Sequence, residues 1–304
     1  MSSESSYYVP EQSWYPIATA MGAAMLIYGG GTIMTSGNPT WLFIALAVII
    51  SVLFMWFRTV IDENHRGLAG DQLKRSYVMG FGWFVFSEVM FFAAFFGALF
   101  YIRVLALPWL SGEGDGAMNP ELLWNGFEAE WPLLTTPDQF ANGENAKFVG
   151  AHEGMSFPGW SMDKLLAWLP LWNTVVLLTS SWTVHNAHHA LKHDKRLKFN
   201  IWLSVTVALG VIFLGFQVAE YVHAYKDLGI TLGSGVYGTT FYMLTGFHGA
   251  HVTLGTIFLA IQLIRSFRGH FKFDDHFGFE AASWYWHFVD VVWVGLFLFV
   301  YVLG

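Results

Sequence analysis

Histidines and two carboxylates placed within apolar stretches are the residues of this chain that could do chemistry. His185, His188 and His189 form an HxxHH pattern, and His248/His251 and His287/Asp290 are pairs at i, i+3. On a helix these spacings bring side chains to one face. Imidazoles gathered on one face could converge on a metal such as zinc, copper or iron. The spacing therefore raises the question of a metal site.

Glu88 lies within Phe86–Phe92, deep in an apolar stretch. A carboxylate in such surroundings is expected to be protonated or paired with a group on another helix. Two interpretations follow: a site that exchanges a proton, or a neutral acid that only joins two helices by a hydrogen bond. Glu220 lies near the end of its own apolar stretch, and we expect it to reach the outer membrane interface.

Seven stretches are long enough to cross a bilayer as helices, since about 20 apolar residues suffice. They cover residues 16–35, 40–61, 76–107, 165–190, 199–223, 236–265 and 279–303. The composition agrees, because only 12% of the 304 residues are charged, about half the share of a soluble domain. The sequence therefore predicts an all-α integral membrane protein and excludes an ordinary soluble enzyme. The absence of cysteine excludes disulfides and thiolate metal sites.

Lysine and arginine are distributed unevenly between the two ends of these spans. The loops after spans two, four and six hold 11 of them, and the opposite side holds Arg103, Lys147, Lys164 and Lys226. By the positive-inside rule the N-terminus faces the cytoplasm and the C-terminus the other side. Residues 1–15 are a polar tail without the basic start and short apolar core of a signal peptide.

One segment, 108–164, interrupts the membrane pattern. It holds nine acidic residues and two lysines, so its charge of −7 equals the net charge of the whole chain. We divide the chain into the tail (1–15), a two-helix bundle (16–61), a loop with the third helix (62–107), the acidic insertion (108–164) and helices four to seven (165–304). The insertion is interpreted as a solvated cap or as a contact surface for a basic soluble partner.

An HxxHH box also occurs in membrane di-iron desaturases and hydroxylases, which is the alternative function. Those enzymes need about eight histidines in three boxes at one membrane face, whereas here there is one box. The HxxHH histidines are expected at the cytoplasmic end of span four, and His248 and His251 at mid-membrane. We therefore expect no metal, and a structural polar network instead, formed by His188, His189, Glu220, His248, His251, His287 and Asp290.

Several long motifs, in order, resemble one family, subunit III of the haem-copper cytochrome c oxidases. They are Ser87–Phe92, Asn173–Leu178, Ala187–His189, Gly235–Phe241, Thr245–Val252 and, most closely, His276–Trp293. The resemblance extends over residues 40–304 apart from the insertion, which is much longer than the family's usual short connection.

The resemblance implies a fold of seven helices in two bundles, helices 1–2 and helices 3–7, around a V-shaped cleft filled with phospholipid. It implies a non-catalytic subunit that stabilises the catalytic subunit and supports proton uptake and oxygen access. Haem and copper would belong to subunits I and II, so this chain would have bound phospholipids and no cofactor of its own. Glu88 would correspond to the family's intramembrane carboxylate that carbodiimides label.

By the same resemblance, six residues match positions near phospholipid headgroups: Trp56, Arg58, Glu63, Arg265, Arg268 and His270. The expected partners are subunits I and II, phospholipids and, near the acidic insertion, cytochrome c; no nucleic acid is expected. We expect the protein to lie in a bacterial plasma membrane in preference to a mitochondrial inner membrane.

Overall fold

The computed structural model describes residues 12–68, 70–143, 155–271 and 276–304. Helices are the only regular secondary structure within these ranges, which confirms the all-α prediction. The long helices are α1 (Tyr15–Ser36), α2 (Thr40–His65), α3 (Asp71–Phe100), α8 (Leu169–Lys192), α9 (Arg196–Lys226), α10 (Gly235–Phe267) and α11 (Phe277–Leu296). The short ones are α4 (Leu107–Leu110), α5 (Pro120–Leu123), α6 (Pro137–Ala141), α7 (Met162–Ala167) and the π-helical turns η1 (Tyr101–Ala106) and η3 (Phe297–Val302).

Six helical segments of the described chain are long and apolar enough to cross a membrane: Tyr15–Ser36, Thr40–His65, Gln72–Leu110, Arg196–Lys226, Gly235–Phe267 and Phe277–Val302. The seventh predicted span contains α8, which has 24 residues. This helix is less apolar because hydroxyl, amide and imidazole side chains recur along it. A membrane crossing by α8 therefore stays a prediction, as does the lipid-filled cleft.

The chain divides into two compact units, residues 1–82 and 83–304. In the first unit α1 and α2 pack closely on each other. A Cβ atom on Gly29 would lie 2.6 Å from the backbone nitrogen of Leu42, so only glycine permits this approach. The Tyr15 hydroxyl and the Thr59 hydroxyl are 2.9 Å apart and join the other ends of the two helices.

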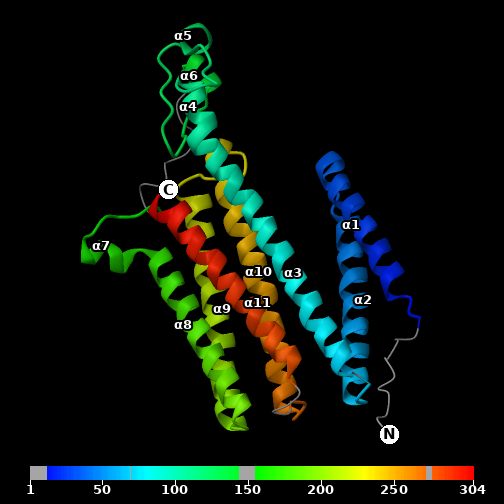
Figure 1. Ribbon diagram of the computed structural model, residues 1–304. Helices are drawn as coiled ribbons and strands as arrows, with labels where there is room; N and C mark the ends of the chain where they lie inside the picture. Colours follow the sequence, from blue (N-terminus) through cyan, green and yellow to red (C-terminus); the bar gives the residue numbers. More distant parts are fainter. Residues whose placement is uncertain (1–11, 69, 144–154, 272–275) are drawn as a thin grey trace. The chain divides into compact units, whose positions relative to one another are not determined.

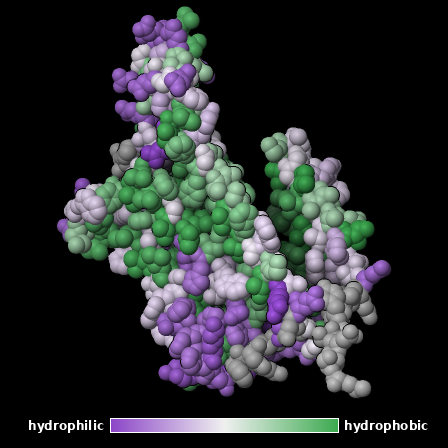
Figure 2. Space-filling model, viewed as in Figure 1, coloured by the Kyte–Doolittle hydropathy of each residue, from purple (hydrophilic) through white to green (hydrophobic). Residues whose placement is uncertain are grey.

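The second unit is built around four helices, in which α8 packs on α9, α9 on α10, α10 on α11, and α11 back on α8 (Figure 1). Trp286 on α11 is completely buried within this group. Its ring lies 2.8 Å from the position that a Cβ of Gly255 would take, so glycine on α10 makes room for the indole. Apolar residues cover the middle of this unit, and hydrophilic residues gather toward its ends (Figure 2).

Residues 108–143 of the insertion are folded at the end of α3, where α4, α5 and α6 gather (Figure 1). Leu107, Phe127 and Leu133 are buried together in a small apolar core. The indole nitrogen of Trp124 donates a hydrogen bond to the Leu110 carbonyl at 2.9 Å. The segment therefore has an internal structure that holds its acidic side chains in place.

Arg103 joins the base of the insertion to the end of the chain. Its guanidinium donates to the carbonyl of Leu303 at 2.6 Å and to that of Phe299 at 3.3 Å. The same group lies over the Trp131 ring, 5.0 Å from its centre. The last carbonyls of a helix have no partner within the helix, and a cation there is favourable. Arg103 therefore connects three segments: the turn η1 that carries it, the end of the chain, and the part of the insertion that holds Trp131.

We expect Arg103→Ala to lower the free energy of unfolding by about 1.5–3 kcal/mol, the usual contribution of a hydrogen bond to a charged group. Arg103→Lys should recover part of this loss, because an ammonium can reach one carbonyl but cannot bond both in a planar fork. Thermal unfolding in detergent, followed by tryptophan fluorescence, measures the effect. Equal midpoints for Arg103→Ala and the unchanged protein would contradict it.

Candidate functional site

Glu88 on α3 is paired with His251 on α10. The Oε2 atom of Glu88 lies 2.9 Å from Nε2 of His251, and their side chains are 24% and 12% exposed. The expectation that Glu88 is paired with a group on another helix is therefore met, and α10 is that helix. The other ring nitrogen, Nδ1, lies 2.6 Å from the Phe247 carbonyl.

This second contact determines what the pair can do. A carbonyl oxygen only accepts, so Nδ1 carries a hydrogen and donates it to Phe247. Nε2 of a neutral His251 is then an acceptor, and the hydrogen between the two side chains comes from a protonated Glu88. The alternative state is an imidazolium facing a carboxylate. In both states one proton is held between Glu88 and His251.

Aromatic rings surround the pair. Phe92 packs edge-on against His251 with ring centres 4.9 Å apart, and the Tyr285 ring stacks on it at 6.3 Å. Phe91 and Phe288 have ring centres at 6.0 and 6.2 Å from that of His251. An environment of this kind excludes water, so a hydrogen bond between charged or exchangeable groups is strong within it.

His248 does not join this pair, although it lies one helical turn away. It is completely buried, and its neighbours are Phe92, Phe213 and Trp293. Neither of its ring nitrogens has a hydrogen-bond partner among the described residues. The i, i+3 spacing of the two histidines therefore does not produce a shared site.

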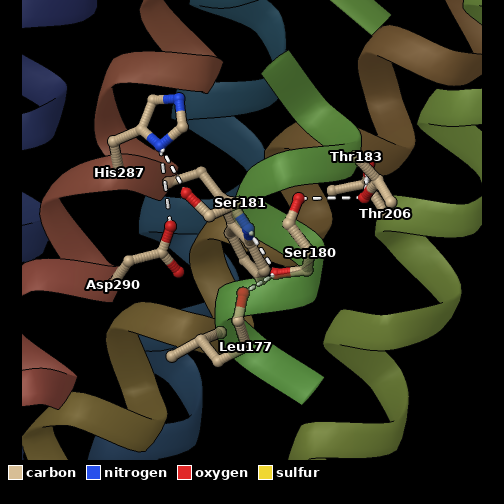
Figure 3. Close-up of polar contacts among 8 residues, drawn as sticks. Leu177, Ser180, Ser181, Thr183, Thr206, His287 and Asp290 are labelled. Carbon is tan, nitrogen blue, oxygen red and sulfur yellow. Dashed lines mark hydrogen bonds and ion pairs between the residues drawn. The ribbon is translucent and has the colours of Figure 1, made fainter. Parts of the chain in front are cut away.

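His287 and Asp290 lie together on α11, with Nδ1 and Oδ2 3.6 Å apart. Ser181 on α8 is closer, since its hydroxyl lies 2.8 Å from the same Nδ1 (Figure 3). One turn away, Ser180 accepts a hydrogen bond from the indole nitrogen of Trp286 at 2.9 Å. Polar contacts thus join α8 to α11 at two successive levels.

The same face of α8 is bonded to α9. The hydroxyls of Thr183 and Thr206 are 2.8 Å apart and both are buried (Figure 3). These hydroxyls, with Ser180 and Ser181, form a polar network that the sequence analysis missed. Small hydroxyl residues in an apolar helix are the signal that could have revealed it, because such residues bond across helices.

Glu220 is buried in the bundle, with 3% of the residue exposed. It lies on α9, six residues before the helix ends at Lys226. Its position at the outer membrane interface stays a prediction. The Tyr301 hydroxyl near the chain's end lies beside Glu220.

The HxxHH histidines do not converge on one point. His188 lies 3.2 Å from the carboxylate of Glu280, which also lies 3.2 Å from His276. His189 faces elsewhere, and its ring centre is 4.2 Å from that of His193. No described contact joins these residues to His248 or His251. The sequence analysis missed His276 and Glu280, although their i, i+4 spacing could have indicated them.

The predicted lipid residues Trp56, Arg58 and Glu63 all lie on α2. The Trp56 ring stacks on that of Tyr15, and Arg58 lines a groove with a volume of about 420 Å³. The other residues along this groove are Tyr15, Met55, Thr59, Ile61, Asp62 and His65. A guanidinium beside hydroxyl groups is suited to bind a phosphate.

The other predicted lipid residues lie at the end of α10. Arg265 donates to the Gln262 side chain at 3.1 Å and lies over the Phe271 ring, 4.8 Å from its centre. Arg268 is exposed just after the helix, and the His270 amide donates to the Arg265 carbonyl at 3.1 Å. The structure therefore places Arg265, Arg268 and His270 in one turn.

The sequence matches the family described as "Cytochrome c oxidase subunit III" over residues 5–113 and 150–304. Among similar proteins, cytochrome c oxidase subunit 3 of Prototheca wickerhamii is 34% identical over 302 residues, covering 98% of this chain and 97% of that protein. The proteins of the same name from Triticum aestivum and Oryctolagus cuniculus are 35% and 32% identical, with the same coverage. These matches support the subunit interpretation over the di-iron enzyme.

The unmatched residues, 114–149, lie within the acidic insertion. Apart from residues 1–4, the family match covers the rest of the chain, including Glu88, His251 and the motif at His276–Trp293. The chain therefore belongs to the cytochrome c oxidase subunit III family.

Proposed function

We propose that this chain is a non-catalytic subunit of a proton-pumping cytochrome c oxidase in aerobic respiration. It binds subunits I and II, which hold the haem and copper that pass electrons from cytochrome c to oxygen. The chain itself holds no redox centre; it stabilises the catalytic subunit, binds phospholipid, and supports proton uptake and oxygen access. The observation that carries this proposal is the Glu88–His251 pair in an aromatic environment.

The pair is suited to hold a proton within the membrane. Nδ1 of His251 is fixed by the Phe247 carbonyl, so the proton has only Glu88 and Nε2 as positions. A small movement within a 2.9 Å hydrogen bond converts a neutral pair into an ion pair. Both states hold the same proton, so movement along this bond transfers the proton between Glu88 on α3 and His251 on α10 without a change in the charge of the pair.

The location of the complex remains a prediction. We propose a bacterial plasma membrane, with the N-terminus in the cytoplasm and the C-terminus in the periplasm, from the distribution of lysine and arginine. The relatives cited above come from eukaryotes, and a mitochondrial inner membrane is the competing location.

We expect Glu88→Gln to leave assembly intact and to weaken sustained proton pumping or shorten the lifetime of the enzyme during turnover. Glutamine keeps a hydrogen bond to His251 but cannot exchange the proton. Pumping is measured in proteoliposomes, and the lifetime is the number of turnovers before inactivation.

Glu220→Gln is the matched control, because Glu220 is another buried carboxylate of the bundle but contacts no histidine among its described contacts. We expect it to keep the normal lifetime. His251→Gln should reproduce the effect of Glu88→Gln, and the double variant should add nothing further, since either change alone already prevents proton transfer between the two side chains. If Glu88→Gln pumps protons and loses activity at the same rates as the unchanged enzyme, Glu88 has only a packing role.

We expect Arg58→Ala to reduce the anionic phospholipid that remains bound after mild delipidation. A basic residue near a headgroup contributes about 1 kcal/mol, so affinity should fall about fivefold. Arg66→Ala is the control, because Arg66 pairs with Asp62 at 2.5 Å and does not line the groove. Mass spectrometry of the retained lipid measures the change. An equal loss in both variants would indicate a general charge effect and no headgroup site.

The acidic insertion is proposed to attract a basic soluble partner, and cytochrome c is the expected one. Its seven acids within the described residues are all exposed: Glu113, Asp115, Glu121, Glu128, Glu130, Asp138 and Asp163. Long-range attraction between opposite charges speeds association and is screened by salt. The folded core of the insertion would keep these charges in a fixed arrangement.

We expect replacement of Glu113, Asp115, Glu121, Glu128 and Glu130 by their amides to raise KM for cytochrome c at low ionic strength. The five substitutions leave the apolar core of the insertion unchanged, which a deletion would not. At high ionic strength KM should equal that of the unchanged enzyme, because salt screens the attraction. Steady-state oxidation of cytochrome c at two salt concentrations gives both values. An unchanged KM at low salt would leave the insertion as a solvated cap.

A further inference from the structure

His188, His276 and Glu280 form a compact group of ligand atoms that the proposed function does not use. His188 comes from the last turns of α8, His276 precedes α11, and Glu280 lies in the first turn of α11. Their ligand atoms all lie within 4.8 Å of one another. It is the only such group of three or more histidine or acidic side chains in the described ranges.

We propose that His188, His276 and Glu280 form a binding site for a divalent cation of the Zn²⁺ type. Both Nε2 atoms lie 3.2 Å from Oε1 of Glu280. In a tetrahedral zinc site with bonds of about 2.0–2.2 Å, neighbouring ligand atoms are about 3.3–3.6 Å apart. The two nitrogen–oxygen separations therefore need to change by only a few tenths of an ångström for a cation to enter, and the ligand atoms of the two histidines lie within 4.8 Å of each other.

The donor set defines the class of cation. Two imidazoles and one carboxylate suit zinc and similar transition-metal ions, whereas magnesium and calcium prefer oxygen ligands throughout. Three protein ligands leave a fourth position of the tetrahedron for water. The side chains of His188, His276 and Glu280 are 20%, 11% and 26% exposed, so the group is largely but not completely buried.

Hydrogen bonding alone is the competing explanation, in which both imidazoles donate to one carboxylate oxygen. A bound cation would replace these two hydrogen bonds. Each imidazole would stay neutral, because its proton can lie on Nδ1 while Nε2 binds the cation. Lys192, one turn after His188, is a positive charge that acts on His188 electrostatically and would repel a cation there. A cation must bind against this repulsion, which provides a specific test.

A bound cation would join the end of α8 to the beginning of α11. The end of α8 and the beginning of α11 lie at the same end of the bundle, which the distribution of lysine and arginine predicts to face the cytoplasm. The cation would therefore reinforce the bundle at its cytoplasmic end, and removing it should loosen both helix ends. This proposal does not depend on the role of the chain in an oxidase.

The test uses the protein purified with the subunits that accompany it, treated with a chelator and then dialysed against ZnCl₂. Elemental analysis of the unchanged protein should show one equivalent of zinc at this site. We expect that equivalent to be missing from His188→Gln, His276→Gln and Glu280→Gln. The loss of affinity should exceed the 10- to 100-fold that is usual for removing an outer-shell partner. Lys192→Gln should bind zinc more tightly, because it removes a repelling charge.

The control is the double variant His189→Gln/His193→Gln, which removes an exposed histidine pair on the same end of α8. It should keep the zinc equivalent. X-ray absorption at the zinc edge should show two imidazole ligands and oxygen ligands, and zinc should slow hydrogen exchange around residues 185–192 and 277–282. Assembly of each variant is checked by the haem content of the purified complex. Unchanged zinc content in all three single variants, or an equal loss in the control, would overturn the proposal.

Discussion

A polar side chain on a lipid-facing bundle can be satisfied only by other parts of the protein, and this constraint organises residues 83–304. Each long helix of the unit contributes at least one polar contact to a neighbour. Glu88 meets His251, Ser181 meets His287, and the Thr183 and Thr206 hydroxyls meet each other. Since hydrocarbon gives no hydrophobic reason for helices to associate, these contacts and close packing determine which helices are neighbours.

The same constraint explains why aromatic residues accompany the polar ones. Rings of Phe92, Tyr285 and Phe288 cover His251, and Trp293 and Phe213 cover His248. A ring that excludes water increases the strength of a hydrogen bond between the groups that it covers. The exclusion of water also raises the free-energy cost of a polar group without a hydrogen-bond partner. Polar side chains can therefore lie only where a partner is available. The apolar and polar parts of the bundle are therefore parts of one arrangement.

The length and positions of the helices could be predicted from the sequence, because hydrocarbon thickness imposes long apolar stretches. The partner of Glu88 could not, since it depends on how α3 and α10 are rotated about their axes, which an apolar stretch does not specify. The burial of Glu220 could not be predicted either, because it depends on which face of α9 packs against the other helices. Ser181, His276 and Glu280 were missed because their roles arise from contacts between helices that are distant in sequence.

Two polar contacts, at different levels of the bundle, help to hold α3 against its neighbours. Glu88 bonds to α10, and 15 residues later Arg103, in the turn that continues α3, bonds to the carbonyls at the end of the chain. At 1.5 Å per residue these two contacts are separated by about 22 Å along the helix. These two polar contacts restrain α3 at two levels, together with the ring contacts of Phe91 with Phe247 and of Phe96 with Phe299. The insertion begins at residue 108, five residues after Arg103, so the contact made by Arg103 lies at the base of the acidic segment. The Glu88–His251 pair and the base of the acidic segment are therefore connected through α3 and the turn η1 that follows it.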